Sequence, residues 1–209
     1  MAFAAVGALS VHYDEQGPPG APPLLLLHSL GTSLHIWDPV VPALARLYRV
    51  VRCDLRGHGL TAGGIDPADP ATTVDELAGD ALGLLDALSI ERAAVCGLSI
   101  GGMVALRMAA RAPGRIEWLA LCGTGYRIGT PQSWAERAAA VAREGLAALA
   151  DALVARWVTP EFLAQRPAEV RGLTTMLVRT PADGYIAGCR ALGAADLEAD
   201  ARALRTPAL

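Results

Sequence analysis

The chain has 209 residues, of which 53% are hydrophobic, and this length and composition suit one soluble globular α/β domain with a full core. Its formal charge of −3 at pH 7 argues against nucleic acid or an anionic membrane surface as a partner. The amino-terminal stretch lacks a basic start followed by a long apolar run, and the longest apolar run, PPLLLL, is too short to cross a bilayer. We therefore expect a cytoplasmic protein with no signal peptide and no membrane contact.

The first part of the chain alternates apolar runs with amphipathic stretches. This alternation predicts an α/β fold with a mostly parallel sheet covered by helices on both faces. Ligands of such a sheet gather at the carboxyl ends of its strands. We predict two edge strands at 3–6 and 9–13, further strands at 24–28, 48–54, 93–98 and 116–122, and helices at about 37–47, 73–88 and 103–112.

From 131 to about 199 the sequence is helical with several breaks and shows no strand-like alternation. We interpret it as an all-helical lid over the strand ends, where it would shape a pocket and exclude water. An ordinary second helical layer is the alternative. The predicted domains are a core at 1–125, the lid at 126–199 and a return to the core at 200–209. The lid supplies large apolar faces and cations, namely Trp134, Trp157, Tyr185, Arg127, Arg137, Arg179 and Arg190.

One serine, Ser99, lies between two glycines in the stretch CGLSIGG, after a predicted strand and before a predicted helix. Strand, sharp turn and helix around G-x-S-x-G are typical of a nucleophilic serine, because glycines on both sides let strand and helix pass closely. The N–H of Ile100 at the helix start can then point at a developing oxyanion. The bare five-residue pattern is weak by itself, and a structural turn serine is the alternative.

Two other predicted strands end in loops that can lie beside Ser99. HSLGTSLH ends a strand in a tight turn that can offer the backbone N–H of Leu30 as a second oxyanion donor. DLRGHGLT ends the neighbouring strand, and we interpret its Asp54 and His58 as structural because they belong to a different strand end. His28 and His35 are interpreted in the same way, as hydrogen-bonded histidines of turns.

The four cysteines, Cys53, Cys96, Cys122 and Cys189, are scattered, with no C-x-x-C pair. Buried free thiols are the simplest account of them in a cytoplasmic protein. No cluster of histidine, cysteine and carboxylate residues has the spacing of metal ligands, so we expect no metal and no cofactor.

Together HSLGTSLHIWDP, DLRGHG, CGLSIGGMVAL, LALCGTGYRIGTPQSW and DGYIAGCRALGAADL resemble the α/β-hydrolase superfamily, and within it the 3-oxoadipate enol-lactonases of bacterial aromatic catabolism. The resemblance runs from the first strands to Leu209. It implies that water opens the ring of 3-oxoadipate enol-lactone, a small-molecule substrate, without cofactor or metal.

The resemblance also implies roles for residues. Ser99 would attack the lactone carbonyl, and the N–H groups of Leu30 and Ile100 would hold the oxyanion. The substrate bears a free carboxylate, for which Arg127 is the first candidate. Trp134 and Tyr185 are further substrate-binding candidates.

In this fold the order along the chain is serine, acid and histidine, with the last two after later strands. No histidine follows His58, and LRTPAL resembles the opening of a later strand. We therefore expect the acid, the histidine, the last strands and the closing helix beyond Leu209, either in a longer chain or in a separate C-terminal segment. A deliberate truncation or a complete pseudoenzyme would also account for this ending.

Other functions remain open. A general carboxylic-ester hydrolase or perhydrolase would use the same serine, and a non-catalytic ligand-binding protein of this fold would tolerate loss of the base. A dehalogenase is disfavoured, because it needs a carboxylate where Ser99 stands.

Overall fold

The computed structural model describes residues 2–66, 68 and 71–209. Its centre is a six-stranded sheet in the order β1-β2-β4-β3-β5-β6. β3, β4, β5 and β6 run parallel, while β1 and β2 are antiparallel to their neighbours. The predicted, mostly parallel sheet is confirmed. The strands are β1 (Ala2–Val6), β2 (Leu9–Gln16), β3 (Pro23–Leu27), β4 (Arg49–Cys53), β5 (Ala93–Leu98) and β6 (Ile116–Cys122).

One edge of the sheet differs from the prediction, and the other agrees with it. Only β1 is an edge strand at its side, because β2 pairs with β4 as well as with β1, with Tyr13 opposite Cys53. The prediction of β2 as an edge strand is therefore wrong. At the other side the chain returns to β6, where the Leu121 N–H donates to the Leu209 carbonyl at 2.8 Å. Ala208 bridges Leu119 in parallel, so the last described residues add to the sheet beside β6.

The helices follow the predicted pattern with one exception. The predicted helix at 37–47 is replaced by a short 3-10 helix, Leu34–Trp37, and a single turn, α1 (Val41–Leu44). Pro42 explains this, because proline has no N–H to donate inside a helix and its ring clashes with the carbonyl group four residues before it. The remaining helices are α2 (Val74–Ala87), α3 (Ile100–Arg111), a 3-10 turn Pro113–Arg115, α4 (Pro131–Val154), α5 (Pro160–Gln165), α6 (Pro167–Val178), α7 (Ala182–Ala194) and α8 (Glu198–Ala203).

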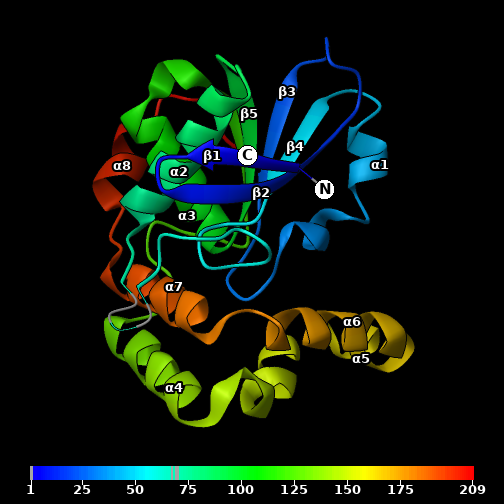
Figure 1. Cartoon of the computed structure of the whole chain (residues 1–209), viewed down its shortest axis with the longest axis vertical. Coiled ribbons are helices and arrows are strands. Elements are labelled where there is room, and N and C mark those ends of the chain that lie inside the picture. Colours follow the sequence, from blue (N-terminus) through cyan, green and yellow to red (C-terminus); the bar gives the residue numbers. More distant parts are fainter. Residues whose placement is uncertain (1, 67, 69–70) are drawn as a thin grey trace.

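Helices lie on both faces of the sheet (Figure 1). α2 and α3 cover one face over the larger core, to which strand residues such as Leu25, Leu27 and Val95 contribute. α1 lies on the other face, over a smaller core that contains Leu24 and Leu26. Neighbouring strand residues thus enter opposite cores, as the two-residue repeat of a strand requires.

The helices α4, α5, α6 and α7 lie together on one side of the core, below the sheet in Figure 1. α4 begins after Thr130, whose side chain accepts the N–H of Ser133, and is kinked at Gly145, which has φ 76°. α8 instead returns to the core, where Asp200 forms an ion pair with Arg107 of α3 at 3.0 Å. Among the described residues, no helix is both long and apolar enough to cross a membrane.

Candidate active site

Ser99 lies at the junction between β5 and α3, as the sequence predicted. Its backbone adopts φ 56° and ψ −117°, a conformation that is costly for a residue with a side chain. The Ser99 N–H donates to the Cys122 carbonyl at 2.9 Å, and its carbonyl accepts the Thr124 hydroxyl at 2.7 Å. Among the described residues, none hydrogen bonds to the Ser99 hydroxyl. Hydrogen bonds therefore hold the backbone of Ser99, while its hydroxyl oxygen has no hydrogen-bond partner in the described part of the chain.

The two glycines that flank Ser99 are required by close packing. A Cβ atom on Gly97 would lie 2.6 Å from the Cα of Gly102, and one on Gly101 would lie 2.7 Å from the carbonyl oxygen of His28. Both distances are shorter than any van der Waals contact. Strand and helix thus approach each other as closely as their backbones allow, as the sequence pattern predicted.

The predicted oxyanion donors lie in two different elements. Ile100 is the first residue of α3, where backbone N–H groups have no acceptor inside the helix. Leu30 lies in a turn closed by the Thr32 N–H, which donates to the Ser29 carbonyl at 3.2 Å. Gly31 at the third position of this turn has φ 76°, as a type II turn requires. The N–H groups of Leu30 and Ile100 have no acceptor among the residues described.

Two buried histidines hold the loops beside this turn. His58 donates from Nδ1 to the Arg56 carbonyl at 3.1 Å, and its Nε2 accepts the Gly31 N–H at 3.1 Å. His28 donates from Nδ1 to the Ser29 carbonyl at 2.8 Å and accepts the Leu55 N–H at Nε2 at 2.9 Å. Burial lowers the pKa of both, and that of His58 falls to about 3. Each ring is therefore neutral with both nitrogens occupied, so neither can act as a base for Ser99.

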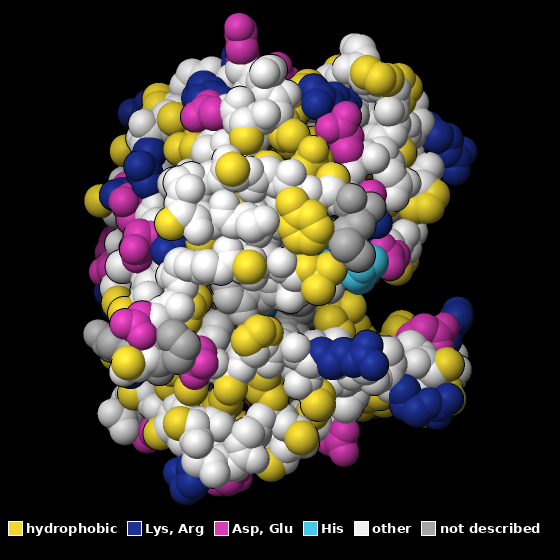
Figure 2. All heavy atoms as spheres, in the orientation of Figure 1, with side chains coloured by type: hydrophobic (Ala, Val, Ile, Leu, Met, Phe, Trp, Pro, Cys, Tyr) yellow, Lys and Arg dark blue, Asp and Glu magenta, His cyan; other side chains and the backbone are white. Residues whose placement is uncertain are grey.

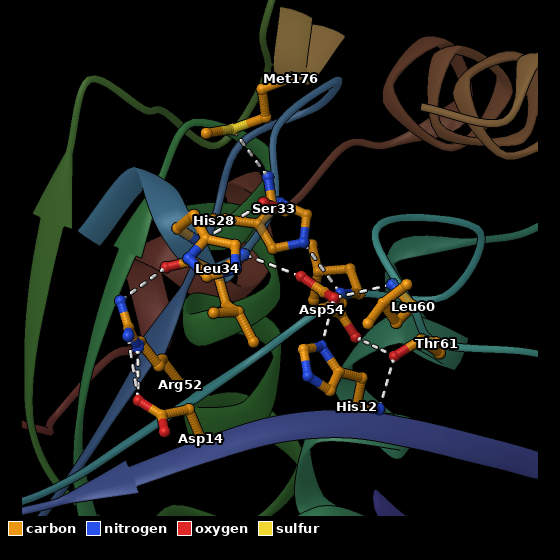
Figure 3. Close-up of polar contacts among 12 residues, drawn as sticks. His12, Asp14, His28, Ser33, Leu34, Arg52, Asp54, Leu60, Thr61 and Met176 are labelled. Atoms are coloured by element: carbon orange, nitrogen blue, oxygen red, sulfur yellow. Dashed lines mark hydrogen bonds and ion pairs between the residues drawn. The ribbon is translucent and has the colours of Figure 1, made fainter. Parts of the chain in front are cut away.

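Asp54 joins three segments of the chain (Figure 3). Its buried carboxylate accepts the N–H groups of Leu34 and Leu60, each at 2.8 Å, and lies 2.7 Å from Nδ1 of His12. The Thr61 hydroxyl donates to the Asp54 carbonyl at 2.7 Å and accepts the His12 N–H at 3.0 Å. Burial acts to raise the pKa of Asp54, but nearby His28 and the hydrogen-bond donors outweigh it and hold the pKa below its ordinary value. These contacts fit the structural role predicted for Asp54.

Two of the aromatic candidates, Trp134 and Tyr185, lie on α4 and α7, which pack on each other, whereas Trp157 follows the end of α4. Tyr185 is only 2% exposed and packs on the turn beside Leu30, since a Cβ on Gly31 would lie 2.8 Å from its ring. Burial raises the pKa of Tyr185 to about 12, and the positive charge of Arg137 opposes that rise. The Arg137 guanidinium lies 5.1 Å from the centre of the Trp134 ring, whose Nε1 donates to the Ile128 carbonyl. No carboxylate forms an ion pair with Arg137 in the described part of the chain.

Arg127, the first candidate for the substrate carboxylate, lies on the surface with 53% of its side chain exposed. It forms an ion pair with Asp196, in the segment after α7. The two residues line a small surface depression that contains neither Trp134 nor Tyr185. The structure thus brings Tyr185 to the turn of Leu30 and Gly31 and leaves Arg127 with a carboxylate partner of its own.

A cleft of about 430 Å³ lies between the core and α6. Figure 2 shows it as the hollow at the right of the molecule, between the core and the arm formed by α5 and α6. Ser99 is not among its lining residues. They come from the strand-end loops, β2 and the end of α6, and are His12, Thr32, Ser33, His35, Asp54, Gly59, Leu60, Gly172, Thr175, Met176, Arg179 and Thr180.

All four cysteines are free, as expected, but not all are buried. Cys53 and Cys189 are buried, whereas Cys96 is half-buried and Cys122 is exposed. The sulfur atoms of Cys96 and Cys122 lie 3.9 Å apart on the neighbouring strands β5 and β6. The expectation of four buried thiols is therefore wrong for this pair, which lies on the sheet face opposite α2 and α3.

His35, expected as a turn histidine, is exposed and lies 3.1 Å from Asp38.

Sequence reasoning missed several residues around the site. His12 carries no local motif, because its contacts with Asp54 and with Thr61 cross 42 and 49 residues of chain. Arg52, which is 6% exposed and forms ion pairs with Asp14 and Asp38, was also missed. A charged residue inside an apolar strand was the signal that could have identified it.

Known proteins resemble this chain over most of its length. A model of the alpha/beta hydrolase fold matches residues 22–180. 3-Oxoadipate enol-lactonase 2 of Acinetobacter baylyi is 32% identical over 96% of this chain and 74% of its own length. 3-Oxoadipate enol-lactonase 1 of the same organism is 36% identical over 92% of this chain and 71% of its own length.

A similar result comes from solved structures. The enol-lactonase from Burkholderia xenovorans LB400 is 42% identical, has a TM-score of 0.94 and is matched over 99% of this chain and 79% of its own. That match includes the helices α4 to α7 as well as the sheet. With the matched fold model and the strand, turn and helix around Ser99, these similarities show that the chain belongs to the α/β-hydrolase family.

Proposed function

We propose that this protein hydrolyses 3-oxoadipate enol-lactone to 3-oxoadipate, with Ser99 as the nucleophile. The observation that carries the proposal is the backbone of Ser99, a serine at φ 56° between β5 and α3 with no described partner for its hydroxyl. Strained backbone of this kind persists where the surrounding structure fixes it, and it clusters at active sites. The substrate is suggested by relatives that are named enol-lactonases and match this chain through the lid.

The proposed reaction has two steps. The Ser99 oxygen attacks the lactone carbonyl while a base takes its proton, and the N–H groups of Leu30 and Ile100 stabilise the oxyanion. The bond between the carbonyl carbon and the ring oxygen then breaks, and the leaving enolate takes up a proton and becomes a ketone. Water, activated by the same base, hydrolyses the acyl-enzyme and regenerates the serine.

The proposal assigns none of the described residues as the base or as its acid partner. Both ring nitrogens of His28 and of His58 are occupied, which leaves neither available to Ser99. The matched relatives are longer than this chain, which spans 74% and 71% of the two enol-lactonases of Acinetobacter baylyi. The N–H of Leu209 donates to the Leu119 carbonyl at 2.9 Å, which places Leu209 beside β6.

For the free carboxylate of the substrate the proposal requires a lid cation. Arg127 is already paired with Asp196, whereas Arg137 has no carboxylate partner among the described residues. Arg137 lies over the Trp134 ring and close to Tyr185. We therefore favour Arg137 and keep Arg127 as the alternative. Trp134 and Tyr185 complete the proposed binding site.

Four free thiols fit a reducing compartment, so the proposed location is the cytoplasm.

The test compares 3-oxoadipate enol-lactone with p-nitrophenyl acetate, in a preparation whose intact mass has been measured. We expect turnover that depends on Ser99 and a kcat/KM for the lactone far above that for the ester. Similar values for both substrates would indicate a general ester hydrolase. Lactone binding without turnover, unchanged in Ser99→Ala, would indicate a binding protein. If the measured mass equals that of the 209 residues, inactivity of this preparation would be explained by the absence of a base for Ser99.

A further inference from the structure

The cleft between the core and α6 has buried polar residues in its walls. His12, Thr32, Asp54 and Thr180 line it, and each is at most 6% exposed. Buried polar groups cost free energy unless they form hydrogen bonds. The hydroxyl groups of Thr32 and Thr180 meet this requirement, because both donate to backbone carbonyl groups. The ring of His12 meets it only in part.

His12 has one ring nitrogen without a partner. Its Nδ1 lies 2.7 Å from the Asp54 carboxylate and donates to it, whereas no described residue hydrogen bonds to Nε2. This Nε2 is accessible to solvent, because Nε1 of Trp37 is the one fully buried side-chain nitrogen or oxygen without a partner in the part of the chain that the structure describes. Since Nδ1 carries the hydrogen, Nε2 of the neutral ring accepts a hydrogen bond.

Asp54 fixes the orientation of this ring (Figure 3). Its carboxylate is held in turn by the N–H groups of Leu34 and Leu60, each at 2.8 Å. The backbone of His12 is fixed as well, because its N–H donates to the Thr61 hydroxyl at 3.0 Å. The acceptor on the core side of the cleft is therefore oriented before a ligand binds, which lowers the cost of binding.

The opposite wall, formed by α6, contributes a positive charge. Arg179 directly follows the last residue of α6, is exposed and lines the cleft. None of the described carboxylates forms an ion pair with it. Ser33 also lines the cleft, and its N–H donates to the sulfur of Met176 at 3.3 Å, although a thioether is a weak acceptor. This side of the cleft thus offers a guanidinium and a weakly bonded N–H, both suited to a carboxylate.

We propose that this cleft binds a small hydroxycarboxylic acid. The carboxylate lies against Arg179 and the Ser33 N–H, and the hydroxyl group donates to Nε2 of His12. This orientation keeps the anionic end of the ligand away from the charge of Asp54. The cleft volume of about 430 Å³ is in the range of small-molecule sites.

The proposed site is separate from Ser99. His12 lies on β2 and Ser99 follows β5, and the strands β4 and β3 lie between these two in the sheet. Neighbouring strands are about 4.8 Å apart, so roughly 14 Å separates β2 from β5. Ser99 does not line the cleft. The inference therefore does not rest on the proposed function, and it is tested by binding rather than by turnover.

Binding is measured by NMR on protein with isotope-labelled methionine methyl groups, titrated with 3-hydroxybutyrate. Met176 lines the cleft, whereas Met103 is buried in the core and serves as the internal control. We expect a saturable shift of the Met176 methyl alone, with a dissociation constant on the order of 1 mM for a ligand of this size. Butyrate, which lacks the hydroxyl group, should bind about three- to tenfold more weakly, the contribution of one neutral hydrogen bond.

Two arginine variants locate the carboxylate. Arg179→Leu should weaken the binding of 3-hydroxybutyrate by about tenfold or more, the loss of a charge-assisted hydrogen bond. Arg171→Leu is the matched control, because Arg171 is an exposed arginine of the same helix that does not line the cleft. Equal losses in both variants would mean that general surface charge attracts the acid, and would overturn the proposal.

Removal of the ring nitrogen tests the contact with the hydroxyl group. His12→Phe keeps a ring but lacks Nε2, so 3-hydroxybutyrate and butyrate should bind this variant with equal affinity. If the variant does not fold, the two acids are compared in the unsubstituted protein, where equal affinities would refute the contact with His12. A Met176 methyl that does not shift at about 50 mM acid, far above the expected dissociation constant, would overturn the site itself.

Discussion

Gly97 and Gly101 lie so close that a side chain on Gly97 would overlap the backbone carbonyl of Gly101. This contact brings the end of β5 against the first turn of α3, with Ser99 between them. Gly101 in turn lies on the carbonyl groups of Leu27 and His28 at the end of β3. The serine and the turn after β3 are therefore held at a spacing that only glycine permits.

A methyl group at Gly101 tests this packing. The Cβ of Gly101→Ala would lie 2.7 Å from the His28 carbonyl oxygen and could be relieved only by backbone movement. We expect the variant to lose about 3 kcal/mol of unfolding free energy, the cost of overpacking a rigid contact, together with most of its activity. Gly114→Ala is the matched control, because nothing lies within 4 Å of its added Cβ. Denaturant unfolding of both variants measures the difference, and an equal effect would disprove the packing argument.

Substitution of Ser99 separates its chemistry from its backbone strain. Both Ser99→Ala and Ser99→Gly should lose at least about 10⁴-fold in kcat, as expected when a nucleophile is removed. Glycine also relieves the positive φ of 56°, so the Gly variant should exceed the Ala variant in stability by about 1 kcal/mol. Thermal unfolding and turnover of the two variants check these points. Turnover that survives in Ser99→Ala would exclude the serine mechanism.

Two lid arginines compete for the substrate carboxylate. We expect Arg137→Leu to raise KM for the acidic lactone by about tenfold or more, the loss of a charge-assisted hydrogen bond, and to spare a neutral ester. Arg127→Leu should change KM little, because Asp196 already neutralises Arg127. Steady-state kinetics of both variants on both substrates decide between them. The reverse pattern would assign the carboxylate to Arg127, and equal losses on lactone and ester would exclude either arginine from this role.

Buried histidines make the stability depend on pH. The pKa of His58 is lowered from its ordinary value of 6.5 to about 3, chiefly by burial. Between these values the unfolded chain holds a proton that the folded chain lacks, so stability is present above about pH 6.5 and is lost as the pH falls toward 3. His28 shifts in the same direction. The lowered pKa of Asp54 acts only at more acidic pH, as the pH falls below its ordinary value of 3.8.

The variant His58→Gln removes one of these titrations. Proton uptake on unfolding, obtained from the slope of unfolding free energy against pH between about pH 4 and 6, should fall by about one proton. His35→Gln serves as the control, because His35 is exposed and lies in a surface pair with Asp38. An unchanged slope in His58→Gln would mean that His58 is protonated in the folded protein.

Local patterns predicted the elements on which the site is built. The order of strand, glycine turn and helix around Ser99 depends on residues within a few positions of one another, and the structure reproduces it. The run of helices after β6 was predicted for the same reason. The predicted helix at 37–47 is wrong although its signals are local, because Pro39 and Pro42 prevent one continuous helix despite the apolar periodicity.

Only the tertiary structure determined which distant residues form hydrogen bonds or ion pairs with each other. His58 reaches Gly31 across 27 residues, Asp54 reaches His12 across 42, and Arg127 reaches Asp196 across 69. No periodicity within a strand or helix encodes such pairs, because they depend on which strand ends meet at the edge of the sheet and on how the lid packs over them. The sequence by itself determined the kind of fold and the strand, turn and helix that present its serine. The order of the strands decided which loops lie beside that serine, and the packing of the lid decided which arginine lies beside its aromatic rings.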